Sequence, residues 1–92
     1  MITAFVLIAA EPARIADLAA ELADTSGVAE VYSVAGDHDL IAIIKVKNYD
    51  DIAAVVTEQM VKIPGIVRTN TITAFRVYSR NDREGGFTLG GA

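Results

Sequence analysis

The chain has 92 residues, of which 52% are hydrophobic and 22% are charged, and its formal net charge is −4. This length fits a single domain with a modest core, so the high apolar content favours self-association. The negative charge and the scatter of basic residues argue against a nucleic-acid-binding surface, and the absence of cysteine excludes disulfides and thiolate metal sites.

An apolar strand is predicted first, from Ile2 to Ala9, because this run is nearly continuous and has the length of a buried strand. It lacks the positively charged start of a signal peptide and is too short to cross a membrane, so we expect a cytoplasmic protein. Pro12 suits the first turn of a helix, and Gly27 is placed to end that helix. The apolar stripe between them has amphipathic spacing and consists of Ile15, Leu18, Ala19 and Leu22.

A β-hairpin is predicted next. Val28 to Ala35 and Asp39 to Lys47 have the composition of strands, and a very short connection that contains Gly36 separates them. Two strands joined by so few residues pair antiparallel.

A second helix and a long strand follow. Asn48 or Asp50 can cap the helix, and Pro64-Gly65 ends it. Its apolar stripe consists of Ile52, Val55, Val56 and Met60. The β-branched residues of this helix lower its intrinsic propensity, so tertiary packing must stabilise it. The last predicted strand runs from Ile66 to Ser79.

The two halves of the chain resemble each other. Ala4 to Ile8 corresponds to Ala42 to Val46, and Gly27-Val28 corresponds to Gly65-Ile66. A repeated strand–helix–strand unit predicts an α+β, ferredoxin-like βαββαβ domain, with a four-stranded antiparallel sheet and two helices on one face. We assign residues 1–79 to this domain. Residues 80–92 are predicted to form either a flexible tail or an arm whose Phe87 and Leu89 clasp a neighbouring subunit.

The hairpin connection is the densest polar cluster, with Gly36, Asp37, His38 and Asp39 in succession. A catalytic interpretation pairs His38 with a neighbouring acid, and a metal interpretation uses the same side chains. Side chains adjacent on a tight turn point in different directions, however, and turn chemistry alone explains glycine and aspartate there. Thr69, Thr71 and Thr73 form a hydroxyl row that fits either good strand propensity or contacts to a small polar ligand.

Two segments together resemble a known family. Val31-Tyr32-Ser33-Val34-Ala35-Gly36-Asp37-His38-Asp39-Leu40 resembles a strand that ends in Gly-Asp-x-Asp, and Ile63-Pro64-Gly65-Ile66-Val67-Arg68-Thr69-Asn70-Thr71 resembles a Pro-Gly-Val-x-x-Thr-x-Thr segment. In this order and spacing, over roughly Thr3 to Tyr78, they resemble the effector-binding (RAM) domain of the Lrp/AsnC transcription regulators. The chain resembles a stand-alone version of that domain, without the family's helix-turn-helix.

The resemblance implies a non-enzymatic, amino-acid-sensing module of transcription regulation that needs no cofactor or metal and makes no direct contact with nucleic acid or membrane. Family dimers pack sheet against sheet, in a dimeric α/β barrel-like assembly, and then form an octamer-like ring with the effector between dimers. The residues carried over to this site are Gly36, Asp37, His38 and Asp39, supported by Thr69 and Thr71. Full-length regulators of the family are the implied partners. His38 replaces a frequent aromatic residue, which leaves the side-chain preference of the pocket open.

Two alternatives remain open from the residues. One is a small dimeric ferredoxin-like enzyme of the monooxygenase or isomerase type, with a pocket inside each subunit between sheet and helices. The plain apolar stripes of the two predicted helices weaken this interpretation, because such a pocket needs polar or aromatic lining. The other is a purely structural oligomer. The effector's identity, the number of dimers and the downstream partner are not specified by the sequence.

Overall fold

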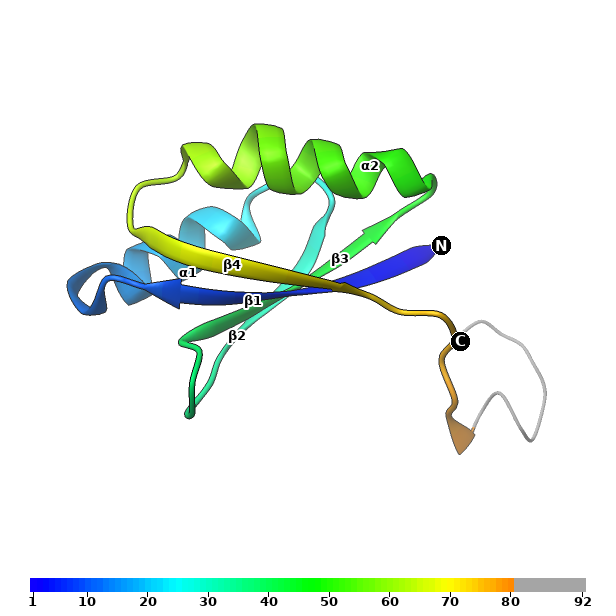
Figure 1. Ribbon diagram of the computed structural model, residues 1–92, viewed down its shortest axis with the longest axis horizontal. Helices are drawn as coiled ribbons and strands as arrows, with labels where there is room; N and C mark the ends of the chain where they lie inside the picture. Colours follow the sequence, from blue (N-terminus) through cyan, green and yellow to red (C-terminus); the bar gives the residue numbers. More distant parts are fainter. Residues whose placement is uncertain (81–92) are drawn as a thin grey trace.

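The computed structural model describes residues 1–80 and contains one four-stranded antiparallel sheet with two helices on one face (Figure 1). The strands are β1 (Ile2–Ala10), β2 (Val28–Ser33), β3 (Leu40–Val46) and β4 (Ile66–Thr73), and the helices are α1 (Ile15–Ala23) and α2 (Tyr49–Ala53). The strand order is β2-β3-β1-β4. The predicted ferredoxin-like α+β fold is confirmed.

The core lies between the helices and the sheet. Ala4, Val6 and Ile8 alternate along β1 and are fully buried, because every second side chain of a strand points to the same face. Leu18 and Leu22 of α1 cover one part of this face, and helix α2 with the residues that follow it covers the other (Figure 1).

The helix that begins with α2 changes its winding. It continues into a π-helical segment, Ala54–Gln59, and a 3-10 turn, Met60–Lys62. A π-helical turn contains more residues than an α-helical one and rotates the side chains that follow it. In this segment Val55 is buried, whereas Val56 is only half-buried. The predicted apolar stripe is therefore correct in extent, but its two valines are not equally buried.

Turn and cap predictions agree with the structure. Asn48 precedes α2, and its N–H donates to the Asp51 carboxylate at 3.3 Å, so the first turn is capped. Pro12 begins a 3-10 turn, Pro12–Arg14, ahead of α1. Gly27 follows α1 with φ of 92°, the left-handed conformation that favours glycine after a helix.

Strand β4 is shorter than predicted. It ends at Thr73, not at Ser79, although its apolar alternation continues further. Its partner β1 begins at Ile2, and the Ala74 N–H donating to the Thr3 carbonyl at 2.9 Å is the last backbone bond between these segments. A strand needs a neighbour for its backbone groups, so the pattern alone placed the end too late. Strand β2 likewise ends two residues early, at Ser33, not at Ala35.

The sheet face opposite the helices is termed the open face. Strand register assigns to it Thr3, Phe5 and Leu7 of β1, Glu30 and Tyr32 of β2, Ile41, Ile43 and Lys45 of β3, and Arg68, Asn70 and Ile72 of β4. Its apolar residues include Ile72 on the edge strand β4, which is 50% exposed. Tyr32 lies on the edge strand β2, where hydrogen bonding to the Glu30 side chain, and then the negative charge of that carboxylate, raise the pKa of its phenol. No helix within residues 1–80 is long and apolar enough to cross a membrane.

Candidate functional site

The connection between β2 and β3 is anchored by Asp39. Its N–H donates to the Ile8 carbonyl at 2.8 Å, and its carboxylate accepts a hydrogen bond from the Ala10 N–H at 2.8 Å. Its carbonyl accepts from the Val34 N–H at 3.0 Å, which closes the loop. One aspartate therefore ties the hairpin to the end of β1. This is a structural role that sequence analysis did not foresee.

Gly36 has a conformational role in the same loop. Its φ is 124°, which L side chains rarely adopt. A Cβ built on Gly36 would meet no atom within 4 Å, so space does not require glycine there. The loop keeps this residue for its backbone shape, and the solvent side of Gly36 is open to an approaching molecule.

Asp37 and His38 lie between Gly36 and Asp39 in this loop. Asp37 is exposed and His38 is half-buried. Within residues 1–80 neither side chain makes a hydrogen bond or ion pair, and the backbone N–H groups of Gly36, Asp37 and His38 also make none. The anchored loop thus presents donors and a carboxylate to the outside. Among the described residues, no cluster of three potential ligands could hold a metal ion.

The predicted supporting threonines occupy two different places. Thr69 lies opposite Ile8, which also pairs with Leu40, so Thr69 is level with the hairpin but one strand beyond β1. Thr71 lies opposite Val6, farther along the sheet. Two strand spacings separate β3 from β4, roughly 9–10 Å. Thr69 therefore lies at the same end of the sheet as the β2–β3 hairpin, whereas Thr71 lies two residues farther from that end.

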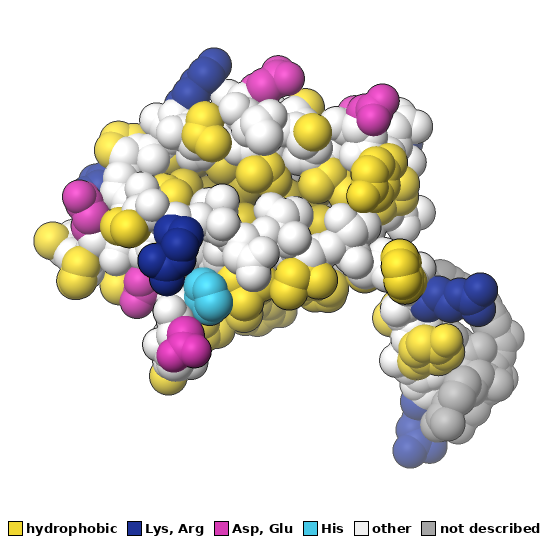
Figure 2. Space-filling model, viewed as in Figure 1, with side chains coloured by type: hydrophobic (Ala, Val, Ile, Leu, Met, Phe, Trp, Pro, Cys, Tyr) yellow, Lys and Arg dark blue, Asp and Glu magenta, His cyan; other side chains and the backbone are white. Residues whose placement is uncertain are grey.

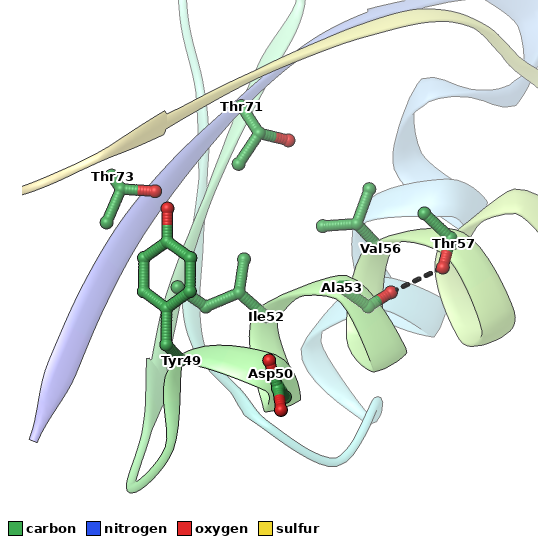
Figure 3. A pocket seen from close by; sticks show the side chains of 8 residues that line it. All are labelled: Tyr49, Asp50, Ile52, Ala53, Val56, Thr57, Thr71 and Thr73. Carbon is green, nitrogen blue, oxygen red and sulfur yellow. Dashed lines mark hydrogen bonds between the residues drawn. The ribbon is translucent and has the colours of Figure 1, made fainter.

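Thr71 belongs to a groove of about 310 Å³ between α2 and β4. Its lining consists of Tyr49, Asp50, Ile52, Ala53, Val56, Thr57, Thr71 and Thr73. Figure 3 shows Tyr49, Ile52 and Val56 pointing toward the strand, whereas Asp50 points away from the two strand threonines. The Thr57 hydroxyl already donates to the Ala53 carbonyl at 2.6 Å. The groove is therefore mainly apolar, with no paired acid and base.

Sequence analysis missed Tyr49 as a lining residue. Its spacing of three and seven residues from Ile52 and Val56 would have placed all three on one helix face. This intrasubunit groove is where the enzyme alternative expected an active site.

The Pro64-Gly65 turn, part of the second recognisable segment, packs against α1. The Arg14 guanidinium donates to the Pro64 carbonyl at 3.3 Å and forms ion pairs with Asp17 and Glu21 at 3.4 and 3.2 Å. A Cβ on Gly65 would lie 2.9 Å from the Arg14 Cβ. This turn therefore joins the start of α1 to the start of β4 through close backbone approach.

Comparison with protein families decides the assignment. The model of the Lrp/AsnC ligand binding domain matches residues 3–84. The chain belongs to the Lrp/AsnC ligand-binding domain family. The predicted resemblance is confirmed, and the domain is of the kind that transcription regulators carry.

The chain is also similar to individual proteins along most of its length. The HTH-type transcriptional regulator PH0140 of Pyrococcus horikoshii is 36% identical over 70 residues, which are 76% of this chain and 44% of that protein. The chain thus spans less than half the length of that relative. TTHA0845 from Thermus thermophilus is 44% identical with a TM-score of 0.81, and the match covers 87% of this chain and 100% of that chain.

A more distant structure shares the Lrp/AsnC fold. The transcriptional regulator NMB0573 of Neisseria meningitidis, solved as an L-Met complex, is 13% identical, with a TM-score of 0.73 over 82% of this chain and 50% of that chain. At this identity the likeness shows the fold alone. The matched part is half of that regulator's chain.

Proposed function

We propose that this domain binds an amino acid effector at the β2–β3 hairpin and couples binding to subunit association, without enzymatic activity. The observation that carries the proposal is the anchored hairpin. Asp39 holds it against β1, and Gly36, Asp37 and His38 present polar groups that no described residue satisfies.

The chemistry of these groups suits an α-amino acid. Successive backbone N–H groups in a turn can hold a carboxylate, and the Asp37 carboxylate can pair with an α-ammonium group. His38 follows Asp37 in the same loop, so its ring would contact the effector's side chain, and Thr69 lies at the same end of the sheet. The L-Met complex of the Neisseria regulator supports an amino acid as the ligand class.

One chain alone would enclose the effector only on one side, and this is the reason to couple effector binding to subunit association. Ligand sites in proteins enclose most of a small ligand's surface, but Asp37 is exposed on the outside of the hairpin. A second subunit would supply the opposite wall, so the effector would bind more tightly to the assembled state and shift the population toward it. Subunits would pair through the open face, and pairs would associate into a ring around the effector sites. The output would pass to longer regulators of the family.

Binding can be tested with a matched pair of variants. Thermal unfolding at one fixed protein concentration, with each of the twenty amino acids at millimolar level, should reveal a stabilising effector. Asp37→Asn should remove most of that stabilisation, whereas Asp24→Asn, an exposed aspartate after α1, should keep it. Equal responses of the two variants would place the effector elsewhere.

A further inference from the structure

An unpaired cation lies at the end of the open face beside the β2–β3 hairpin. Arg68 of β4 lies opposite Ala9 of β1, next to the Ala10 N–H that donates to the Asp39 carboxylate. The Arg68 side chain is exposed, and within residues 1–80 it makes no hydrogen bond or ion pair. Figure 1 shows the hairpin projecting from the sheet on the side away from the helices, which is also the side that register assigns to Arg68.

Other charged side chains outside the hairpin do not take this position. The Arg14 guanidinium is held by two acids of α1 and by the turn before β4. Glu11 follows the end of β1, where the chain turns into α1 and thus toward the helix face of the sheet. Lys45 is on the open face but lies at the opposite end of β3. Arg68 is therefore the cation that faces a ligand at the hairpin from the rest of the sheet.

The space between Arg68 and the hairpin has a low floor. Strand β1 lies between β3 and β4, so these two strands are separated by roughly 9–10 Å. The residue of β1 opposite Arg68 is Ala9, whose methyl group rises little above the sheet. The long aliphatic stem of an arginine can carry its guanidinium across part of this distance. The Arg68 guanidinium can therefore reach the side chain of an effector that is held at the hairpin.

The chemistry of Arg68 selects among amino acids. In the proposed site the backbone N–H groups of the loop bind the α-carboxylate and Asp37 binds the α-ammonium group, so Arg68 and His38 remain for the effector's side chain. A guanidinium matches a carboxylate through two parallel hydrogen bonds. When a second subunit covers the site, Arg68 loses water, and a charge without a partner is then costly. A neutral effector would leave this cost in place, whereas an acidic side chain would remove it.

We propose that the effector is an amino acid with a carboxylate in its side chain, and that Arg68 binds this carboxylate. This inference rests on the proposed function and adds to that site a residue from β4. Figure 2 shows dark blue, cyan and magenta side chains next to one another at the end of the molecule where β4 begins. Basic, histidine and acidic groups thus gather on the surface where the effector's three polar groups would bind.

Isothermal titration calorimetry tests this effector class by comparing each acid with its amide. L-Glutamate and L-glutamine, like L-aspartate and L-asparagine, have nearly the same size and differ in side-chain charge. For the wild-type protein we expect the preferred acid to have a Kd about tenfold below that of its amide. Arg68→Gln should raise the Kd of the acid about tenfold and change that of the amide less than about threefold. Arg68→Lys should fall between, because an ammonium group keeps the charge without the fork. Lys62→Gln, an exposed change at the end of the α2 region, is the matched control and should keep the preference.

The outcomes separate this inference from the proposed function. A wild-type protein that binds a neutral or basic amino acid more tightly than either acid overturns the acidic effector and leaves the proposed function in place. An acid preference that persists in Arg68→Gln overturns the role of Arg68. A protein that binds none of the twenty amino acids overturns the proposed function and this inference together. The acid-to-amide ratio of the wild type tests the effector class without any substitution, and circular dichroism checks that Arg68→Gln keeps the fold.

Discussion

Replacing Asp39 by alanine separates the structural role of the hairpin motif from its proposed ligand role. The change deletes the carboxylate that accepts the Ala10 N–H at 2.8 Å and leaves this donor, on a residue only 7% exposed, without a partner. A hydrogen bond to a charged group contributes about 1.5–3 kcal/mol, so we expect the free energy of unfolding to fall by about 2 kcal/mol. For a domain of this size, the midpoint temperature should fall by roughly 8–15 °C.

Urea unfolding followed by circular dichroism measures this loss, with all variants at the same protein concentration. Asp37→Ala is the control within the same loop, because its side chain makes no bond within residues 1–80, and it should change stability by less than about 0.5 kcal/mol. Asp39→Asn keeps an acceptor and should fall between the two. Equal stability of Asp37→Ala and Asp39→Ala would refute the anchoring role of Asp39.

Two further predictions follow from other contacts. Glu30→Gln should lower the pKa of Tyr32 toward its ordinary value, because the neighbouring negative charge that disfavours the phenolate is removed. An alkaline titration followed by ultraviolet absorbance measures this pKa, and Tyr32→Phe identifies its signal. A Tyr32 pKa that is the same in Glu30→Gln and in the wild type would contradict the role of Glu30. Gly65→Ala should lower the free energy of unfolding by about 1–3 kcal/mol, and by more than Gly36→Ala does. A Cβ at residue 65 would lie 2.9 Å from the Arg14 Cβ, whereas a Cβ at residue 36 would meet no atom within 4 Å. Urea unfolding that ranks the two variants in the opposite order would contradict this packing argument.

The sheet and its helices were predictable because local patterns and tertiary packing agree. The Ile2 to Ala9 run, the Leu18 and Leu22 stripe and the glycine after α1 each specify the element that the structure contains. The end of β4 was not predictable, because apolar alternation up to Ser79 says nothing about whether a neighbouring strand is present. The unequal burial of Val55 and Val56 could not be predicted from the sequence either, because the π-helical winding depends on tertiary packing.

The candidate site was predictable only in part. The Gly36 conformation follows from the short connection, and the structure supports it with φ of 124°. The bond from the Ala10 N–H to Asp39 spans 29 residues of sequence, so no local pattern could indicate it. Thr69 and Thr71 share a strand face, yet only register shows that Thr71 lies beside Tyr49 in another groove. The ligand role of the hairpin remains a prediction.

Native mass spectrometry of the purified protein, with and without the twenty amino acids, tests the central claim most directly. We predict assemblies built from dimers that gain the mass of one particular amino acid per site, with the larger assemblies populated more when that amino acid is present. Dimers or monomers that take up no amino acid, with a mass distribution unchanged by the mixture, would contradict the proposed effector sensing.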